Sequence, residues 1–146
     1  MNGKCAAEIL LVEDNFFDAE TVIIALKEQN PLHNIHYVKD GAVALEYLFE
    51  TGGSLKKEPP KVIILDLKLP KIDGIEVLRR IKSHEHAKNI PVVVLTSSNQ
   101  ESDIQECYRL GVNSFVTKPL EFGNFLKVVS DLGCYWLILN KTPESC

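Results

Sequence analysis

Short apolar runs alternate with stretches of helical periodicity along most of the chain, and this alternation limits the possible folds. Three runs are rich in Val and Ile without a break: Ile9–Val12, Val62–Leu65 and residues 92–95. Two weaker runs cover Ile35–Val38 and residues 114–116. Unbroken Val/Ile runs are typical of strands in a parallel sheet, because helices bury both faces of such a sheet.

Helix-length patterns separate the apolar runs. Their predicted limits are an N-cap at Asn15, a span from Gly41 to the Gly52-Gly53 pair, a start at Asp73, a span over Glu101–Leu110 closed by Gly111, and a last helix after Pro119 that continues through residues 135–140. Asn and Asp favour helix starts, and glycine favours the left-handed residue that follows a helix. Five strands alternating with five helices predict an α/β fold, an open parallel sheet with helices on both faces.

Length and charge exclude several classes of protein. The 146 residues correspond to one domain, and 16 basic against 20 acidic residues give a net charge of −4. Nucleic-acid binding through bulk charge is therefore not expected. The longest apolar run, Cys134–Leu139, is far shorter than the ~20 residues that span a bilayer. With no signal-peptide pattern and four scattered cysteines, a cytoplasmic protein without disulfides is expected.

Polar residues follow four of the predicted strands at the point where each strand ends. Glu13 and Asp14 follow the first strand, Asp66 the third, Thr96 the fourth and Lys118 the fifth. Carboxyl ends of parallel strands meet at one edge of the sheet, where ligands of such sheets bind. Each residue alone is explained as a helix cap or a turn residue, but the combination indicates a site.

The chemistry of that combination is phosphoryl transfer assisted by a metal ion. Three carboxylates held close together raise one another's pKa, and a hard divalent cation such as Mg²⁺ removes the conflict. One carboxylate left partly free is a suitable nucleophile toward phosphorus. The ammonium of Lys118 and the hydroxyl of Thr96 are suited to phosphoryl oxygens.

Four segments taken in order resemble the receiver domain of two-component response regulators. They are ILLVEDN at residues 9–15, DLKLPKIDG at 66–74, PVVVLTS at 91–97 and GVNSFVTKP at 111–119. The resemblance covers residues 9–132, with a lead at 1–8 and a helical extension and tail at 133–146. It implies a flavodoxin-like sheet with strand order 2-1-3-4-5.

The resemblance also implies a role for each matching position. Asp66 is the phosphoacceptor for a phosphohistidine on a sensor histidine kinase. Mg²⁺ is held by Asp14, Asp66, Glu13 and the backbone carbonyl of Lys68. Lys118 contacts the phosphoryl group, Thr96 and Phe115 form the switch pair, and the Lys118–Pro119 bond is cis in the family.

Two positions depart from the commonest family pattern, and a third shapes the acceptor loop. Phe115 stands where Tyr is frequent, so it keeps the packing role without the hydroxyl. The long cationic side chain of Lys68 is expected to affect the lifetime of the acyl phosphate. Gly74 is expected to give the loop after Asp66 backbone freedom.

No DNA-binding output domain follows the receiver pattern, so the expected output is protein binding, phosphoryl relay or self-association. The connection over residues 50–61 and the extension over 135–140 are similar to stand-alone receivers paired with bacterial phytochrome-type histidine kinases. Phe125, Val129 and Trp136 are candidates for an exposed homodimer face, although Trp136 alone is equally explained as a cover for the core.

Two other functions are compatible with parts of the pattern. A phosphohydrolase with an Asp nucleophile usually carries a second Asp two residues later, where this chain has Lys68. A degenerate receiver that only binds partners would not need the full set of acidic residues with Thr96 and Lys118. We therefore expect a signalling phosphoacceptor rather than an enzyme with a separate substrate.

Overall fold

The computed structural model describes residues 8–143, and strands and helices alternate through that range. In chain order the elements are β1 (Ile9–Val12), α1 (Phe16–Gln29), β2 (Ile35–Val38), α2 (Gly41–Leu48), β3 (Val62–Leu65), α3 (Gly74–Ser83), a 3₁₀ turn (Ala87–Asn89), β4 (Val92–Thr96), α4 (Glu101–Leu110), β5 (Ser114–Thr117), α5 (Phe122–Gly133) and a π-helical segment (Cys134–Leu139). The predicted α/β alternation is confirmed.

The five strands form one parallel sheet in the order β2-β1-β3-β4-β5. β1 pairs with β2 on one side and with β3 on the other, and β4 pairs with β3 and β5. This is the flavodoxin-like order expected from the resemblance. The strand order reverses between β1 and β3, and ligands bind beside that point in open parallel sheets.

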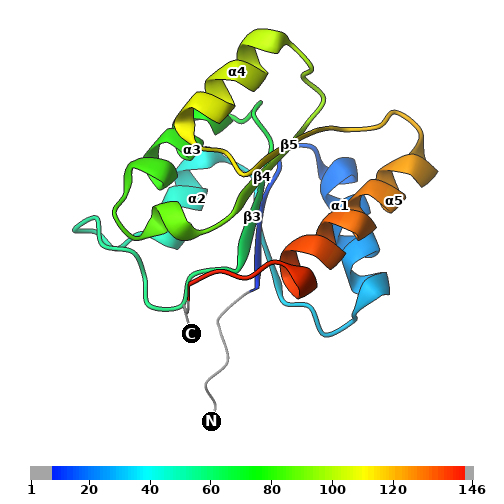
Figure 1. Cartoon of the computed structure of the whole chain (residues 1–146), viewed down its shortest axis with the longest axis horizontal. Coiled ribbons are helices and arrows are strands. Elements are labelled where there is room, and N and C mark those ends of the chain that lie inside the picture. Colours follow the sequence, from blue (N-terminus) through cyan, green and yellow to red (C-terminus); the bar gives the residue numbers. More distant parts are fainter. Residues whose placement is uncertain (1–7, 144–146) are drawn as a thin grey trace.

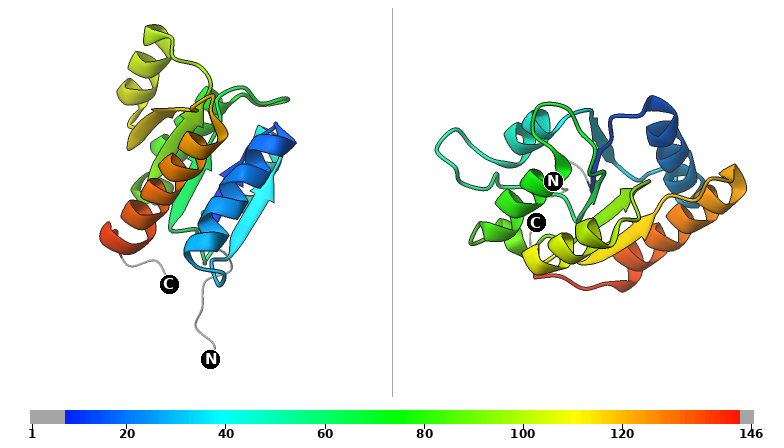
Figure 2. Two further views of the ribbon diagram at one scale, coloured as in Figure 1. Left: turned by 90° about the vertical axis from the view of Figure 1, so that its right-hand side faces the viewer. Right: turned by 90° about the horizontal axis from the view of Figure 1, so that it is seen from above.

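Helices cover both faces of the sheet, which explains the unbroken apolar runs. α1 and α5 lie on one face, and α2, α3 and α4 lie on the other (Figures 1 and 2). Leu10 and Val12 of β1 point into the core beneath α2, α3 and α4, whereas Ile9 and Leu11 point into the core beneath α1 and α5. Since alternate side chains enter two cores, every residue of the strand is apolar.

Helix ends follow the predicted caps, with one exception. The side chain of Asn15 accepts from the Asp18 N–H (3.0 Å), that of Asp73 caps α3, and Gly111 has a φ of 102°. α2, however, ends at Leu48 rather than at the Gly52-Gly53 pair. Phe49 leaves the helix in extended conformation and bridges to Leu55, so a turn replaces the last predicted helical turn.

The C-terminal helix corrects the predicted dimer face. Phe125 and Val129 are only 6% and 0% exposed, because both lie in the core between α5 and the sheet, and Trp136 is half-buried against the same core. Phe125 and Val129 are therefore not exposed as the prediction required, whereas Trp136 keeps part of its surface accessible. Exposed apolar side chains do occur beyond them, at Ile138 and Leu139. No helix within residues 8–143 is long and apolar enough to cross a membrane.

Candidate functional site

The carboxyl edge of the sheet brings together four of the predicted residues. Glu13, Asp66 and Lys118 directly follow β1, β3 and β5, and Thr96 is the last residue of β4. All four are buried, although three of them carry ionisable side chains. Buried ionisable groups are rare unless they are paired, so their partners define the site.

Backbone hydrogen bonds fix these residues beyond the ends of the strands. The Asp66 N–H donates to the carbonyl of Val12 (3.0 Å), and the Lys118 N–H donates to that of Thr96 (2.7 Å). The ladder therefore continues one residue past the apolar runs. Each polar side chain leaves the sheet from a rigid position rather than from a mobile loop.

The ammonium of Lys118 lies at the centre of the cluster. Its Nζ is 2.8 Å from Glu13 Oε1, 3.1 Å from Asp66 Oδ2 and 2.8 Å from Asp18 Oδ2. The sequence did not single out Asp18 for this role. The position of Asp18 in the sequence could have indicated this contact, because the first turn of α1 starts just after Asn15 and therefore lies at the carboxyl edge of the sheet.

The environment gives the two buried acids opposite protonation behaviour. Burial, assisted by the charge of Asp66, raises the pKa of Glu13 to about 7 against the opposing effect of Lys118. Burial alone would also raise the pKa of Asp66, but a hydrogen bond from Thr96 and the charge of Lys118 outweigh it and lower that pKa. Burial opposes the charge of Lys118, but its hydrogen bonds to Asp18 and Glu13 and the negative charges of Glu13 and Asp66 outweigh burial and raise the pKa of Lys118. Asp66 is therefore an ionised carboxylate at neutral pH.

The remaining predicted residues lie around this cluster at different depths. Asp14 is exposed and has no hydrogen bond or ion pair with any residue between 8 and 143. The Lys68 side chain is exposed, while its backbone N–H donates to Asp66 Oδ1 (3.4 Å). Phe115 is half-buried and packs against the core beneath α2, α3 and α4.

The loop after Asp66 is shaped by close packing rather than by glycine flexibility. A Cβ at position 74 would overlap the backbone carbonyl of Asp66 and lie 2.5 Å from the Cα of Leu67. The residue with a left-handed φ in this loop is Lys71, at 69°. Gly74 is therefore needed because α3 begins directly against the backbone of the acceptor residue, which corrects the expected role.

The peptide bond between Lys118 and Pro119 is trans, which differs from the cis bond that the resemblance implied. Trans is the favoured isomer of X–Pro bonds by about 0.5–1 kcal/mol. In this trans arrangement the Lys118 ammonium reaches all three of its carboxylate partners.

The donor chemistry of the edge fits a hard divalent cation. Glu13, Asp14 and Asp66 offer carboxylate oxygens, the ligand type that Mg²⁺ and Mn²⁺ accept. Lys118 supplies one positive charge, so the cluster keeps an excess of acidic groups. In the part of the chain that the structure describes, no three His, Cys, Asp or Glu side chains form a closed metal site, since Lys118 links Glu13 to Asp66 and Asp14 stands apart.

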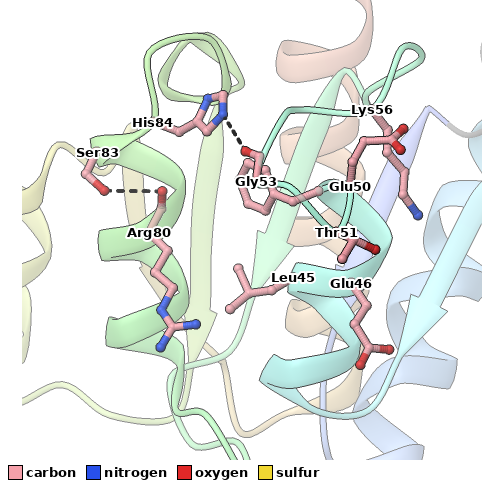
Figure 3. A pocket seen from close by; sticks show the side chains of 10 residues that line it. Leu45, Glu46, Glu50, Thr51, Gly53, Lys56, Arg80, Ser83 and His84 are labelled. Carbon is pink, nitrogen blue, oxygen red and sulfur yellow. Dashed lines mark hydrogen bonds between the residues drawn. The ribbon is translucent and has the colours of Figure 1, made fainter.

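A hollow of about 780 Å³ lies away from this edge, between the end of α2 and α3. Figure 3 shows Leu45 and Glu46 on one wall and Arg80 on the other, with the Nε2 of His84 donating to the carbonyl of Gly53 (3.0 Å). It contains none of the predicted site residues.

Known proteins similar to this chain match it over nearly its full length. The probable methanogenesis regulatory protein FilR2 of Methanothrix harundinacea is 42% identical over 92% of this chain and 86% of its own length. Response regulator Rcp1 of Synechocystis sp. is 40% identical over 88% of each chain.

Solved structures of response regulators also match this chain over most of its length. The phosphorylated cyanobacterial phytochrome response regulator RcpA superposes with a TM-score of 0.86 at 38% identity, covering 95% of this chain and all of the other. The Mn²⁺-bound form of Rcp1 superposes with a TM-score of 0.83 at 39% identity, covering 93% and 98%. Receiver domains bind divalent metal ions and pair with histidine kinases. With the receiver-domain pattern matching residues 9–130, this chain belongs to the response regulator receiver domain family.

Proposed function

We propose that Asp66 accepts a phosphoryl group from the phosphohistidine of a sensor histidine kinase, and that this reaction requires Mg²⁺. One observation carries the proposal: Asp66 is a buried carboxylate kept ionised by Thr96 and Lys118 at the carboxyl edge of the sheet. An Asp66 oxygen attacks phosphorus, the phosphorus–nitrogen bond of the donor breaks, and the departing imidazole retains the bonding pair and takes up a proton. The product is an aspartyl phosphate.

Each side chain at the edge has a task in that transfer. Asp14, Asp66, Glu13 and the Lys68 carbonyl would hold Mg²⁺, which would supply positive charge to the phosphoryl oxygens. Lys118 contacts Asp66 and is placed to contact a phosphoryl oxygen as well. The chain positions and stabilises the group rather than turning over a separate substrate.

Incubation of the chain with acetyl phosphate and Mg²⁺, followed by intact-mass measurement, tests this function. We expect one phosphoryl adduct, which is absent in Asp66→Asn and retained in the matched control Asp73→Asn at the exposed cap of α3. Rapid release of inorganic phosphate with no adduct would instead indicate a phosphohydrolase. The absence of both adduct and turnover would indicate a binding module, and either result contradicts the proposal.

The adduct is proposed to act as a switch. The Thr96 hydroxyl turns toward the phosphoryl group, and Phe115 moves inward into the space that Thr96 leaves, which repacks the surface formed by α4, β5 and α5. Phosphorylation shifts the two states only by binding them with different free energy. Thr96→Ala should accept the phosphoryl group but show a weaker change in partner affinity. Equal affinity of a partner for both forms of the wild type would contradict the switch.

The kinase is proposed to be of the phytochrome type. Similarity to RcpA, which is described as a cyanobacterial phytochrome response regulator, supports this assignment. A phosphotransfer profile across purified sensor kinases tests it: the phytochrome-type kinases should transfer to this chain faster than the others. Preferential transfer from an unrelated kinase would overturn it.

A further inference from the structure

The three carboxylates around the Lys118 ammonium differ in what else they are expected to bind. Glu13 and Asp66 lie within 3.1 Å of Nζ and are also proposed ligands of the divalent cation. Asp18 is outside that ligand set, although its Oδ2 is as close to Nζ (2.8 Å) as Glu13 Oε1 is. Within residues 8–143 the Asp18 carboxylate contacts the cluster through Lys118 alone. Asp18 is therefore the partner of Lys118 for which the cation does not compete.

The cap of α1 fixes the position of Asp18. Asp18 lies in the first turn of the helix, where its backbone N–H donates to the side chain of Asn15 (3.0 Å) and the helix dipole favours a negative charge. Its side chain is 31% exposed, whereas those of Lys118, Glu13 and Asp66 are 7%, 2% and 8% exposed. Asp18 thus lies at the rim of the cluster and contacts the buried ammonium from the solvent side.

Lys118 shares its other two partners with the proposed cation. Both positive charges need the carboxylates of Glu13 and Asp66, and like charges repel each other strongly where burial lowers the effective dielectric constant. Metal ligation by these carboxylates therefore weakens two of the three contacts that hold Nζ. The ammonium is nevertheless needed beside Asp66 at that stage, because it contacts a phosphoryl oxygen in the proposed transfer. The contact with Asp18 is the one that remains to keep it there.

We infer that Asp18 is a positioning residue for phosphoryl transfer, whose carboxylate holds the Lys118 ammonium beside Asp66 while Glu13 and Asp66 ligate the cation. This inference rests on the proposed function, because the competition arises only if the edge binds Mg²⁺ and Asp66 is the acceptor. The effect is local, so its loss should slow the transfer without unfolding the chain. A displacement of about 1 Å at a reacting centre can lower a rate by about 10²-fold.

Nuclear magnetic resonance on the full chain, labelled with ¹³C at the lysine Cε atoms, follows the position of Lys118 directly. The Lys118 signal is assigned by its absence in Lys118→Met. Saturating Mg²⁺ should leave this signal distinct in the wild type, but in Asp18→Asn it should move to the position of the exposed lysines. Glu20→Gln is the matched control, because it removes the same charge from an exposed position on the same helix and should behave as the wild type.

The rate of adduct formation from acetyl phosphate at saturating Mg²⁺ measures the consequence. Asp18→Asn should form the Asp66 adduct about tenfold more slowly than the wild type at equal folded fraction, and Glu20→Gln should match the wild type. In a Lys118→Met background, Asp18→Asn should slow the reaction no further, because Asp18 acts through Lys118.

Three results overturn the inference: a Lys118 signal that stays distinct in Asp18→Asn with Mg²⁺, equal rates in Asp18→Asn and Glu20→Gln, or the same slowing by Asp18→Asn with and without Lys118. A wild-type chain that forms no adduct contradicts the proposed function instead. In that case the resonance comparison still decides whether Asp18 holds Lys118 in the presence of Mg²⁺.

Discussion

The ammonium of Lys118 is shared by the carboxylates of Glu13, Asp18 and Asp66, all within 3.1 Å. At the scale of single residues, this shared positive charge offsets the free-energy cost of burying the carboxylates of Glu13 and Asp66. Removing one partner of a buried ion pair leaves an uncompensated charge, which is far more costly than the loss of a surface pair.

Lys118→Met should therefore lower the free energy of unfolding by about 3 kcal/mol at pH 7. Without the ammonium the pKa values of Glu13 and Asp66 rise, so both acids take up protons in the folded state as the pH falls. The folded variant then binds more protons than its unfolded chain, and its deficit should shrink between pH 7 and pH 5.

Urea unfolding at both pH values, followed by circular dichroism, measures this deficit. The control is Lys127→Met, which removes only the exposed Lys127–Asp131 pair and should change stability by less than about 0.5 kcal/mol. A deficit of the same size at pH 5 and pH 7 would show that Lys118 does not compensate the buried acids.

Lys68 is the residue that we expect to set the lifetime of the aspartyl phosphate. Its side chain is exposed, while its backbone N–H contacts Asp66, so truncation clears the approach to the acceptor without removing that contact. Lys68→Ala should speed dephosphorylation by admitting water, and Lys68→Met, which keeps the bulk, should not. Phosphate release after removal of the donor is the measurement, and identical rates for wild type and Lys68→Ala would disprove the role.

At the scale of elements, the start of α3 determines where the acceptor lies. α3 begins at Gly74 against the backbone of Asp66, at a distance that leaves no room for a side chain. The helix and the strand end are thus in direct backbone contact. Any residue other than glycine would push α3 away from the sheet or displace Asp66.

Gly74→Ala should lower the free energy of unfolding by about 1–3 kcal/mol, as overpacking does. Because the added methyl displaces Asp66, the variant should also accept the phosphoryl group more slowly at equal folded fraction. Gly52→Ala is the control, since a Cβ there meets nothing within 4 Å. Thermal unfolding and the rate of adduct formation are measured together, and wild-type values for both in Gly74→Ala would refute the packing argument.

Sequence periodicity predicts elements well and tertiary packing poorly in this chain. The strands and most helix starts follow from apolar runs and caps, which are local. The end of α2 could not be predicted, because Phe49 leaves the helix to pair with the distant Leu55. Likewise, helical spacing placed Phe125 and Val129 on one face but could not tell a core face from a dimer face.

The candidate site was predictable as a set of strand ends but not as a network. The residues that follow β1, β3 and β5, and the residue that ends β4, are expected at one edge from the parallel order alone. That Asp18 would join them depends on the angle of α1, and that Asp14 would remain outside depends on side-chain rotation. The cap at Asn15 places Asp18 in the first turn of α1, but the helix angle and the side-chain rotation themselves cannot be read from the local sequence.

At the scale of the whole molecule, the segment after α5 exposes several large apolar side chains to solvent. Tyr135, Ile138 and Leu139 are 49%, 59% and 61% exposed on the π-helical segment. If the chain forms homodimers, this segment rather than Phe125 and Val129 offers the contact.

Ile138→Glu should therefore weaken self-association by at least about tenfold, since a charge replaces a buried contact worth ~1.5 kcal/mol or more. Leu32→Glu, at an exposed position between α1 and β2, is the control and should leave association unchanged. Sedimentation velocity over a range of concentrations measures both. A wild-type chain that stays monomeric at high concentration, with and without a phosphoryl analogue, would rule out the dimer.

The Lys118 cluster joins residues that are far apart along the chain. Its contacts with Asp66 and Asp18 span 52 and 100 residues. During synthesis, the acidic residues therefore leave the ribosome long before the lysine that balances them. A nascent chain has no finished acceptor site until β5 docks beside β4, so the ability to receive a signal arrives only as the last strand of the sheet completes the fold.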